Sequence, residues 1–262
     1  MSSEREFCSV EADGRLLVVT IRRPEVMNSL HPPANHELAA VFDAFAADPE
    51  LWVAIITGAG DKAFSAGNDL KYQASGGAMS VPASGFAGLT NRWDLNKPVI
   101  AAVNGIAMGG GFEIALACDL IVAAESAVFA LPEPRVGLAA LAGGLHRLPR
   151  QIGHKQAMGM ILTGRRVGAA EGQQLGFVNE VTPAGEALAG AKRWASQILE
   201  CSPMSIRASK ETVRKGLDHA SVQEAYANQS KADAVRAMFN SADFIEGPMA
   251  FAQKRKPDWK GA

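Results

Sequence analysis

NGIAMGGGFEIALACD, residues 104–119, holds the strongest structural signal in this chain. A β-type run, residues 98–103, leads into three consecutive glycines, and an apolar helix-like segment follows them. Glycines let the backbone turn sharply and let a ligand lie directly against it. The first amides of the following helix have no partner inside the helix and lie at the positive end of its dipole. We therefore expect the amides of Gly110 and Gly111 to be available to a developing negative charge.

Glu113 falls within one turn of these amides, in an otherwise apolar segment. An acid at such a position suggests a chemical task. The alternative is a glycine hinge followed by an ordinary glutamate that the helix dipole favours in the first turn. This stretch alone leaves both interpretations open.

Length and composition limit the classes of protein that fit. The chain has 262 residues, 48% of them hydrophobic and 20% charged, which suits one large domain with a substantial core. A net charge of −1 argues against non-specific nucleic-acid binding. The 3 cysteines are far apart and form no CxxC pair, which favours a reducing compartment. With no signal-like N-terminus and no uninterrupted apolar span, we expect a cytoplasmic protein that does not enter a membrane.

Strand-like and helix-like segments alternate up to about residue 182, and almost everything after it reads helical. This order predicts an α/β core over residues 1–198 and a helical region over 199–262. A Gly-, Ala- and Ser-rich loop at 73–90 is expected to be mobile, either shaping a substrate pocket or lying free on the surface. The expected strands are 7–12, 16–21, 51–58, 98–103, 120–124, 127–131 and 175–181. The expected helices are 31–47, 155–163, 185–199, 205–217, 222–239 and 243–254, with a helical turn at 167–172, and Gly143–Gly144 opens a further segment that ends at Ile152.

Several familiar sites are excluded by pattern. The histidines form no HExxH pair, and the chain has no GxSxG, no P-loop and no GxGxxG spacing. Two acids remain, Glu113 and Glu133, and the second lies between prolines on what should be a stiff, extended backbone. Paired carboxylates suit general acid/base work on a polarised carbonyl compound. Alternatively, Glu113 could cap amides and Glu133 could form an ion pair with Arg135.

Two segments, AFSAGNDL at 63–70 and NGIAMGGGFE at 104–113, resemble the signature segments of the crotonase (enoyl-CoA hydratase/isomerase) superfamily. The resemblance covers nearly the whole chain, and the matching segments in their order are highly specific together. The further matching segments are Arg23–Pro24, Asn28–Leu30, Leu131–Glu133, Arg147–Arg150, Ile161–Gly164, Glu246–Phe251 and Lys254–Pro257.

The resemblance implies a spiral of ββα units followed by helices that form a homotrimer or a dimer of trimers. It implies an acyl-coenzyme A thioester as substrate, with no metal or redox cofactor. By position, the oxyanion-hole amides would be those of Ala66 and Gly110, and the two hydratase acids would be Glu113 and Glu133. The expected contacts with coenzyme A are Arg23, Ala66, Gly67, Asn68, Asp69, Leu70, Gly109, Phe251 and Lys254.

The basic residues at 254–256 follow the last helix-like segment. They either form a solvated helix end, which the dipole favours, or contact the phosphates of coenzyme A. Arg22 and Arg23 are weaker candidates for the same role.

Both hydratase acids are present, which favours hydration of a 2-enoyl-CoA over double-bond isomerisation. Two departures from the usual hydratase pattern stand out, at Leu138–Ala142, where relatives carry Pro-Gly, and at Leu145–His146, where they carry Thr-Gln. These departures point to an atypical acyl group, such as a branched, cyclic, aryl or carnitine-like one. The alternatives are another crotonase reaction (isomerisation through Glu133 alone, carnitinyl-CoA dehydration or thioester hydrolysis) and a non-catalytic acyl-CoA- or protein-binding role.

Overall fold

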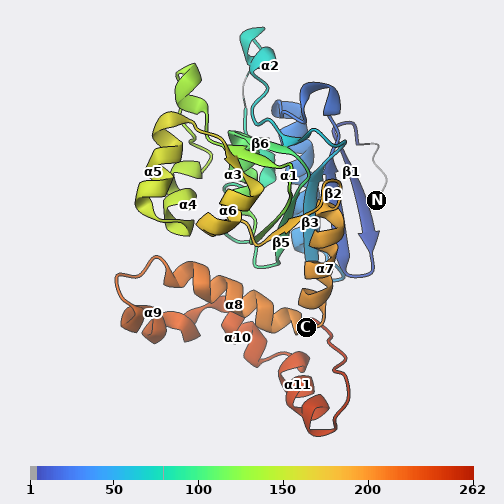
Figure 1. Ribbon diagram of the computed structural model, residues 1–262. Coiled ribbons are helices and arrows are strands. Elements are labelled where there is room, and N and C mark those ends of the chain that lie inside the picture. The colour runs from blue at the N-terminus through green and yellow to red at the C-terminus, as the bar shows by residue number, and fades with distance from the viewer. Residues whose placement is uncertain (1–4, 79) are drawn as a thin grey trace. The chain divides into compact units, whose positions relative to one another are not determined.

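A computed structural model describes residues 5–78 and 80–262 of the chain. The chain packs as two compact units, coloured along the sequence in Figure 1. The first unit comprises the chain up to Trp93 together with Val99–Ala195, and the second comprises Asp94–Pro98 and Ser196–Ala262. The short segment Asp94–Pro98 therefore belongs with the C-terminal helices, which the sequence did not indicate.

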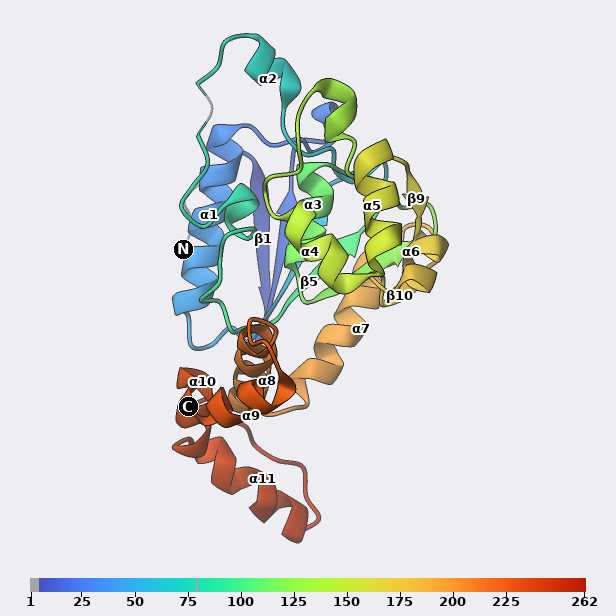
Figure 2. The same cartoon turned by 90° about the vertical axis from the view of Figure 1, so that its left-hand side faces the viewer.

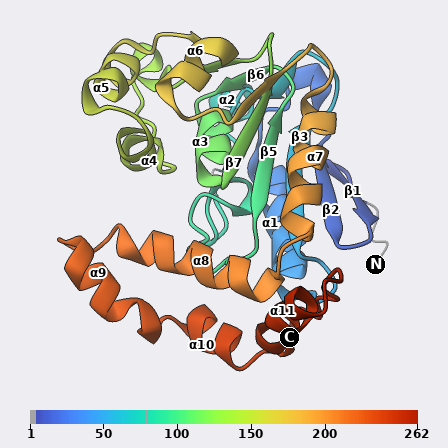
Figure 3. The same cartoon turned by 60° about the horizontal axis from the view of Figure 1, so that its bottom comes forward.

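The first unit is built on a six-stranded sheet with the order β1-β2-β3-β5-β7-β10. Only β1 and β2 pair antiparallel, and every other neighbouring pair is parallel. Figure 3 shows β5 and β7 with α3 on one side and α7 on the other, which agrees with the complete burial of β5. The strands are β1 (Cys8–Asp13), β2 (Leu16–Ile21), β3 (Val53–Gly58), β5 (Val99–Val103), β7 (Leu120–Ala124) and β10 (Glu180–Thr182).

A second sheet of four strands, in the order β4-β6-β8-β9, lies in the same unit. Its strands are β4 (Ala63–Ser65), β6 (Ile106–Met108), β8 (Val128–Ala130) and β9 (Val167–Gly168). The first three are parallel and β9 is antiparallel to β8. The successive pairs β3–β4, β5–β6 and β7–β8 each give one strand to each sheet before the chain turns into a helix. This repeated ββα unit confirms the predicted crotonase-like α/β spiral.

An aromatic cluster fixes the helix that carries Glu113. The rings of Phe112, Phe129 and Phe177 lie 5.1 to 5.2 Å apart and join α3 to β8 and to the segment after α6. The helices that begin in this unit are α1 (Pro32–Ala47), α2 (Leu70–Ala74), α3 (Gly110–Ala117), α4 (Gly144–Gln151), α5 (His154–Thr163), α6 (Ala169–Leu175) and α7 (Ala187–Leu199), with short 3₁₀ helices η1 (Pro24–Val26), η2 (Phe86–Gly88) and η3 (Glu133–Val136).

The second unit is helical, as predicted for residues 199–262. The single helix expected over 222–239 is wrong, because Ala232 takes an extended conformation after the short η4 helix. Its helices are α8 (Pro203–Gly216), α9 (Val222–Asn228), η4 (Gln229–Lys231), α10 (Asp233–Phe239) and α11 (Ala242–Ala252).

Two further local predictions are corrected. Gly176, with φ of 101°, ends α6, so the strand expected at 175–181 begins only at Glu180, and β10 spans Glu180–Thr182. Glu133 is not on an extended backbone: it begins η3, and Pro134 occupies the first turn, where a fixed φ and a missing N–H are tolerated.

Within the described ranges, no helix is both long and apolar enough to cross a bilayer.

Candidate active site

Three neighbouring parallel strands end at one edge of the four-stranded sheet. Residues 66–69 follow β4, Gly109 follows β6, and Glu133 follows β8 by three positions. Because the carboxyl ends of parallel strands lie side by side, segments that are far apart in sequence meet here. The structure thus brings together most of the residues predicted for the site.

The glycines of this edge allow two backbones to touch. A Cβ on Gly67 would lie 2.6 Å from the Met108 carbonyl oxygen and 2.7 Å from the Gly110 nitrogen, and the φ of Gly67 is +86°. A Cβ on Gly111 would lie 2.0 Å from the Ser65 carbonyl oxygen. Only glycine fits these two positions, so the loop after β4 lies directly against the start of α3.

The predicted oxyanion donor Ala66 is corrected, because its N–H already donates to the Met27 carbonyl at 2.9 Å. The candidate donor in this loop is instead Asn68, two positions later. It forms an isolated parallel bridge with Leu30, in which Leu30 donates to Gly67 and accepts from Asp69. In this pattern the N–H of the central residue points away from its partner, and among the described residues the Asn68 N–H meets no acceptor.

Gly110 supplies the second free amide. The N–H of Gly109 is used by the Ala130 carbonyl, and that of Glu113 by the Gly109 carbonyl. Between them, the N–H of Gly110 has no acceptor within the described parts of the chain, as expected for the first turn of a helix. Two unpaired amides, those of Asn68 and Gly110, therefore lie on adjoining segments.

An ion pair holds the loop that carries Asn68. Arg23 contacts Asp69 at 3.0 Å, with only 12% and 9% of their side chains exposed, and also donates to the Ser29 carbonyl. Asp69 in turn caps α2 by accepting from the Tyr72 N–H. Burial raises the pKa of Asp69, but the Tyr72 amide and the Arg23 guanidinium outweigh it and leave this pKa below its usual value. In the structure the Arg23 side chain fixes the loop that carries Asn68. Contact between Arg23 and coenzyme A stays a prediction.

Glu113 is 3% exposed, and its Oε1 accepts from the Gly144 N–H at 2.8 Å. Burial, with a smaller contribution from the negative charge of Glu133, raises the pKa of this carboxyl to about 7, against the lowering effect of the amides of Gly144 and Ala142 and of the Arg147 charge. A glutamate with this pKa exchanges protons near neutral pH.

Glu133 lies against the glycine turn from the other side. Its Oε1 would be 2.9 Å from a Cβ on Gly109. Its Oε2 is buried and, among the described residues, has no hydrogen-bond partner. Burial raises the pKa of this carboxyl too. It does not pair with Arg135, which donates to the Thr163 carbonyl instead.

Part of the loop predicted at 73–90 closes over the site. Figure 2 shows the segment around η2 lying along α1, where the Ala87 N–H donates to Asn35 at 2.7 Å. The Phe86 ring covers Gly110, since a Cβ there would lie 2.6 Å from it. This half of the loop packs on the protein, whereas Met79 lies outside the described residues.

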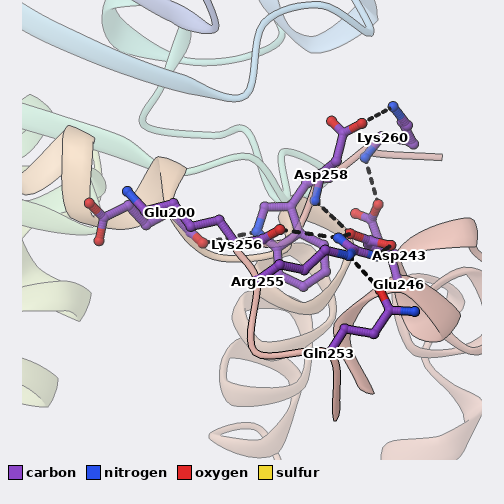
Figure 4. A network of polar contacts seen from close by, with 9 residues as sticks. Glu200, Asp243, Glu246, Gln253, Arg255, Lys256, Asp258 and Lys260 are labelled. Carbon is purple, nitrogen blue, oxygen red and sulfur yellow. Dashed lines mark hydrogen bonds and ion pairs between the residues drawn. The ribbon is translucent and has the colours of Figure 1, made fainter. Parts of the chain in front are cut away.

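The predicted coenzyme A residues Phe251 and Lys254 lie in the second unit. Phe251 is 87% exposed, and Lys254 follows the end of α11 with φ of +54°. Figure 4 shows that the neighbouring Arg255 is engaged by both carboxylate oxygens of Glu246, which also accepts from the Asp258 N–H. These donors hold the pKa of Glu246 at about 2. The helix-end cluster thus offers two lysines, Lys254 and Lys256, rather than three free cations.

Within residues 5–78 and 80–262, no group of three His, Cys, Asp or Glu side chains is placed to hold a metal ion. That the chemistry needs no cofactor stays a prediction.

Residues 11–262 match the protein family described as enoyl-CoA hydratase/isomerase. The chain belongs to this family. It is thus a member of the crotonase superfamily, whose hydratases and dehydratases act on CoA thioesters. The family match spans both units of the chain.

Relatives of this crotonase-family chain carry two kinds of name. A carnitinyl-CoA dehydratase of Salmonella arizonae is 45% identical over 261 residues, covering 98% of this chain and 99% of that protein. One of Proteus mirabilis is 43% identical over 253 residues, covering 95% and 96%. The crystal structure of an enoyl-CoA hydratase from Mycobacterium tuberculosis H37Rv superposes with a TM-score of 0.91 at 38% identity, covering 98% and 99% of the two chains.

Two features of the site were missed by sequence reasoning. The free amide of Asn68 depends on the bridge to Leu30, which joins segments that no local pattern connects. Gly144 was seen only as part of a glycine pair that opens the segment up to Ile152, although its amide holds Glu113. That glycine pair was the available signal, because it allows a close backbone approach.

Proposed function

We propose that this protein is a hydratase, or in reverse a dehydratase, of 2-enoyl-CoA thioesters. The observation that carries the proposal is the pairing of two acids, the buried Glu113 and the half-buried Glu133, beside two unpaired amides, those of Asn68 after β4 and Gly110 at the start of α3. Such an arrangement serves a reaction in which protons and a developing oxyanion must be handled together.

The amides of Asn68 and Gly110 would accept the thioester oxygen. When water adds at the β-carbon, the electrons of the double bond move toward this oxygen and form an enolate. Each donor aimed at the enolate oxygen is worth about 3 kcal/mol in comparable oxyanion holes. The two amides can lie close together only if the two backbones touch, and this explains why Gly67 and Gly111 carry no side chains.

The acids take opposite roles in our proposal. Glu113 accepts from backbone amides, which favour its ionised form, and so it takes the proton of the attacking water. Glu133 has an Oε2 without a donor, which suits the protonated form, and it delivers its proton to the α-carbon. A proton on Glu133 also removes a negative charge that hinders ionisation of Glu113. Water thus gives its oxygen to the β-carbon and one proton to Glu113, while Glu133 gives one proton to the α-carbon.

The loop between the two acids suits a neutral, apolar acyl group. It carries three exposed apolar side chains, Val136, Leu138 and Leu141, and it runs from Glu133 to the turn that binds Glu113. Carnitinyl-CoA dehydration is the second candidate, favoured by the 45% identity to proteins of that name. Both candidates use the same acids and differ in the acyl group.

A panel of enoyl-CoA thioesters tests the proposal. Neutral short, branched and aryl 2-enoyl-CoA thioesters would be compared with one that bears a trimethylammonium group, by following loss of the conjugated chromophore and gain of one water in the product mass. Turnover of a neutral thioester supports our first choice, and turnover of the cationic one alone supports the second. Double-bond migration without gain of water would contradict both.

We further propose that the protein forms a homotrimer or a dimer of trimers. The proposal is supported by the large apolar side chains that the second unit exposes. Light scattering during size-exclusion chromatography would test it, and a monomer at micromolar concentration would contradict it. The exposed side chains concerned are Val213, Leu217, Val222, Tyr226, Phe239, Phe244, Ile245, Met249 and Phe251.

A further inference from the structure

The guanidinium of Arg147, in α4, is held by a hydrogen bond and by an aromatic ring, and it forms no ion pair among the described residues. Its Nη2 donates to the Thr90 carbonyl at 2.9 Å. Its Cζ lies 4.6 Å from the centre of the Trp93 ring. Its Nη1 is buried and has no acceptor among the described residues. Arg147 as a whole is half-buried, and its buried, unpaired Nη1 needs an explanation, because leaving such a donor without a partner is costly.

The idle Nη1 lies over the turn that presents an amide to Glu113. A Cβ built on Gly143 would be 2.1 Å from this nitrogen, so the guanidinium occupies the space over that residue. Gly143 has φ of +107°, and the next residue, Gly144, donates its N–H to Oε1 of Glu113. The side chain of Arg147 therefore packs on the bend that aims this hydrogen bond.

We propose that Arg147 is a positioning residue, which fixes the Gly143–Gly144 turn and, through it and through its own charge, holds the Glu113 carboxylate ready to accept a proton. Thr90 and Trp93 hold the arginine in this place. The loop segment that covers the site is thus linked to the acid through one side chain. The inference rests on the proposed function, in which Glu113 is the base.

The electrostatics agree with this geometry. The Arg147 charge lowers the pKa of Glu113, and the Glu113 charge raises that of Arg147, against the effect of burial on each. Two other ionisable groups act on the pair: Cys118 at the end of α3 raises the pKa of Arg147, and Glu133 in η3 raises that of Glu113. The remaining ionisable groups of η3, α4 and α5 are exposed at the surface: Arg135, His146, Arg150, His154 and Lys155.

Two replacements of Arg147 separate its charge from its shape. Arg147→Lys keeps a positive charge but cannot reach the Thr90 carbonyl and cover Gly143 with one planar group. Arg147→Met keeps much of the length and removes the charge. Arg150→Met is the matched control, since Arg150 is an exposed arginine of the same helix whose Nη1 donates only to a backbone carbonyl.

The first readout is the pKa of Glu113, followed in the ligand-free protein by the ¹³C shift of its carboxyl. Arg147→Met should raise it by about one unit, the lower end of the effect of a nearby opposite charge. The limb of the kcat/KM profile that requires ionised Glu113 should move to higher pH by the same amount. Arg147→Lys keeps the charge and should leave the pKa of Glu113 within about half a unit of that in the unmodified protein. It should lower kcat about 10-fold with little change in KM, because only the orientation of the Glu113 carboxylate is lost. Arg150→Met should match the unmodified protein in all of these.

Each variant can overturn the proposal alone. If the pKa of Glu113 in Arg147→Met equals that in Arg150→Met, the Arg147 charge does not act on Glu113 and the electrostatic part of the proposal is wrong. If kcat is unchanged in Arg147→Lys, Arg147 does not position Glu113 through the Gly143–Gly144 turn. This variant tests the proposal even if Arg147→Met does not fold. If the unmodified protein hydrates no enoyl-CoA, the proposed function fails, whereas the carboxyl shifts still show whether Arg147 controls Glu113.

Discussion

The N–H of Gly144 donates to Oε1 of Glu113 over 2.8 Å and ties the first turn of α4 to the first turn of α3. The amides of Gly144 and Ala142 and the Arg147 charge do not compensate for the burial of this carboxylate, and the pKa of Glu113 is raised to about 7. The folded protein therefore binds one more proton than the unfolded chain between about pH 4.5 and pH 7. Stability contributed by this proton is complete below the unfolded pKa and is lost as pH rises through the folded one.

Glu113→Gln should therefore stabilise the protein at high pH. The replacement removes the charge and keeps an oxygen for the Gly144 amide. The shift of about 2.5 units corresponds to a penalty of about 3 kcal/mol above pH 7, as an upper estimate. We expect the free energy of unfolding of the variant to exceed that of the unmodified protein at pH 8 by up to this amount, and to match it at pH 4.5. Urea unfolding at both values measures the difference.

Glu25→Gln is the control for that experiment, because Glu25 is exposed in the first turn of η1. It should show no difference between the two pH values. An equal loss of stability for Glu113→Gln at both would mean that Glu113 is a structural cap whose charge is well solvated.

The two acids should act as a unit in turnover. Glu113→Gln and Glu133→Gln should each lower kcat about 10²-fold or more, the usual scale for a lost acid or base. The double variant should lose less than the product of the two, because both act on the same proton transfers. Binding of a saturated acyl-CoA, measured by calorimetry, should barely change, since the amides of Asn68 and Gly110 remain.

The single variants also distinguish a hydratase from a one-acid isomerase. Near-full turnover in Glu113→Gln together with complete loss in Glu133→Gln would show that only Glu133 carries the reaction. Our first choice of function would then be wrong.

Much of the fold followed from local patterns, and the parts that failed depend on distant contacts. The apolar runs at β3, β5 and β7 and the glycine turn at Gly109 were predicted from spacing alone. By contrast, whether the amide of Ala66 or that of Asn68 is free depends on the positions of Met27 and Leu30, more than 35 residues earlier. No periodicity encodes such a pairing, so the sequence could not indicate that the Ala66 amide is engaged and that the Asn68 amide is left free.

Lys254 and Lys256 should carry the salt-sensitive part of coenzyme A binding if the helix end contacts phosphates. Arg255 is already neutralised by Glu246. The double variant Lys254→Ala, Lys256→Ala should weaken binding and flatten its dependence on NaCl. Lys260→Ala is the control, because Lys260 pairs with Asp258. Titration calorimetry between low and high salt measures both, and identical slopes for the variant and the unmodified protein would exclude a role in binding phosphates.

Gly67→Ala should abolish turnover, because the added methyl group would meet both the Gly110 nitrogen at 2.7 Å and the Met108 carbonyl oxygen at 2.6 Å. The two backbones would have to separate, and the amides of Asn68 and Gly110 could no longer share one oxygen. Loss of an oxyanion donor costs roughly 10²- to 10³-fold in kcat. Gly14→Ala is the matched control: Gly14 also has a positive φ, of 56°, but nothing lies within 4 Å of its added Cβ. The positive φ should cost each variant about 1 kcal/mol of stability, the backbone clash should add to this loss in Gly67→Ala alone, and only Gly67→Ala should lose turnover. If the two variants kept equal kcat, the free amides beside Gly67 would have no part in the reaction, and the oxyanion site would have to be sought elsewhere.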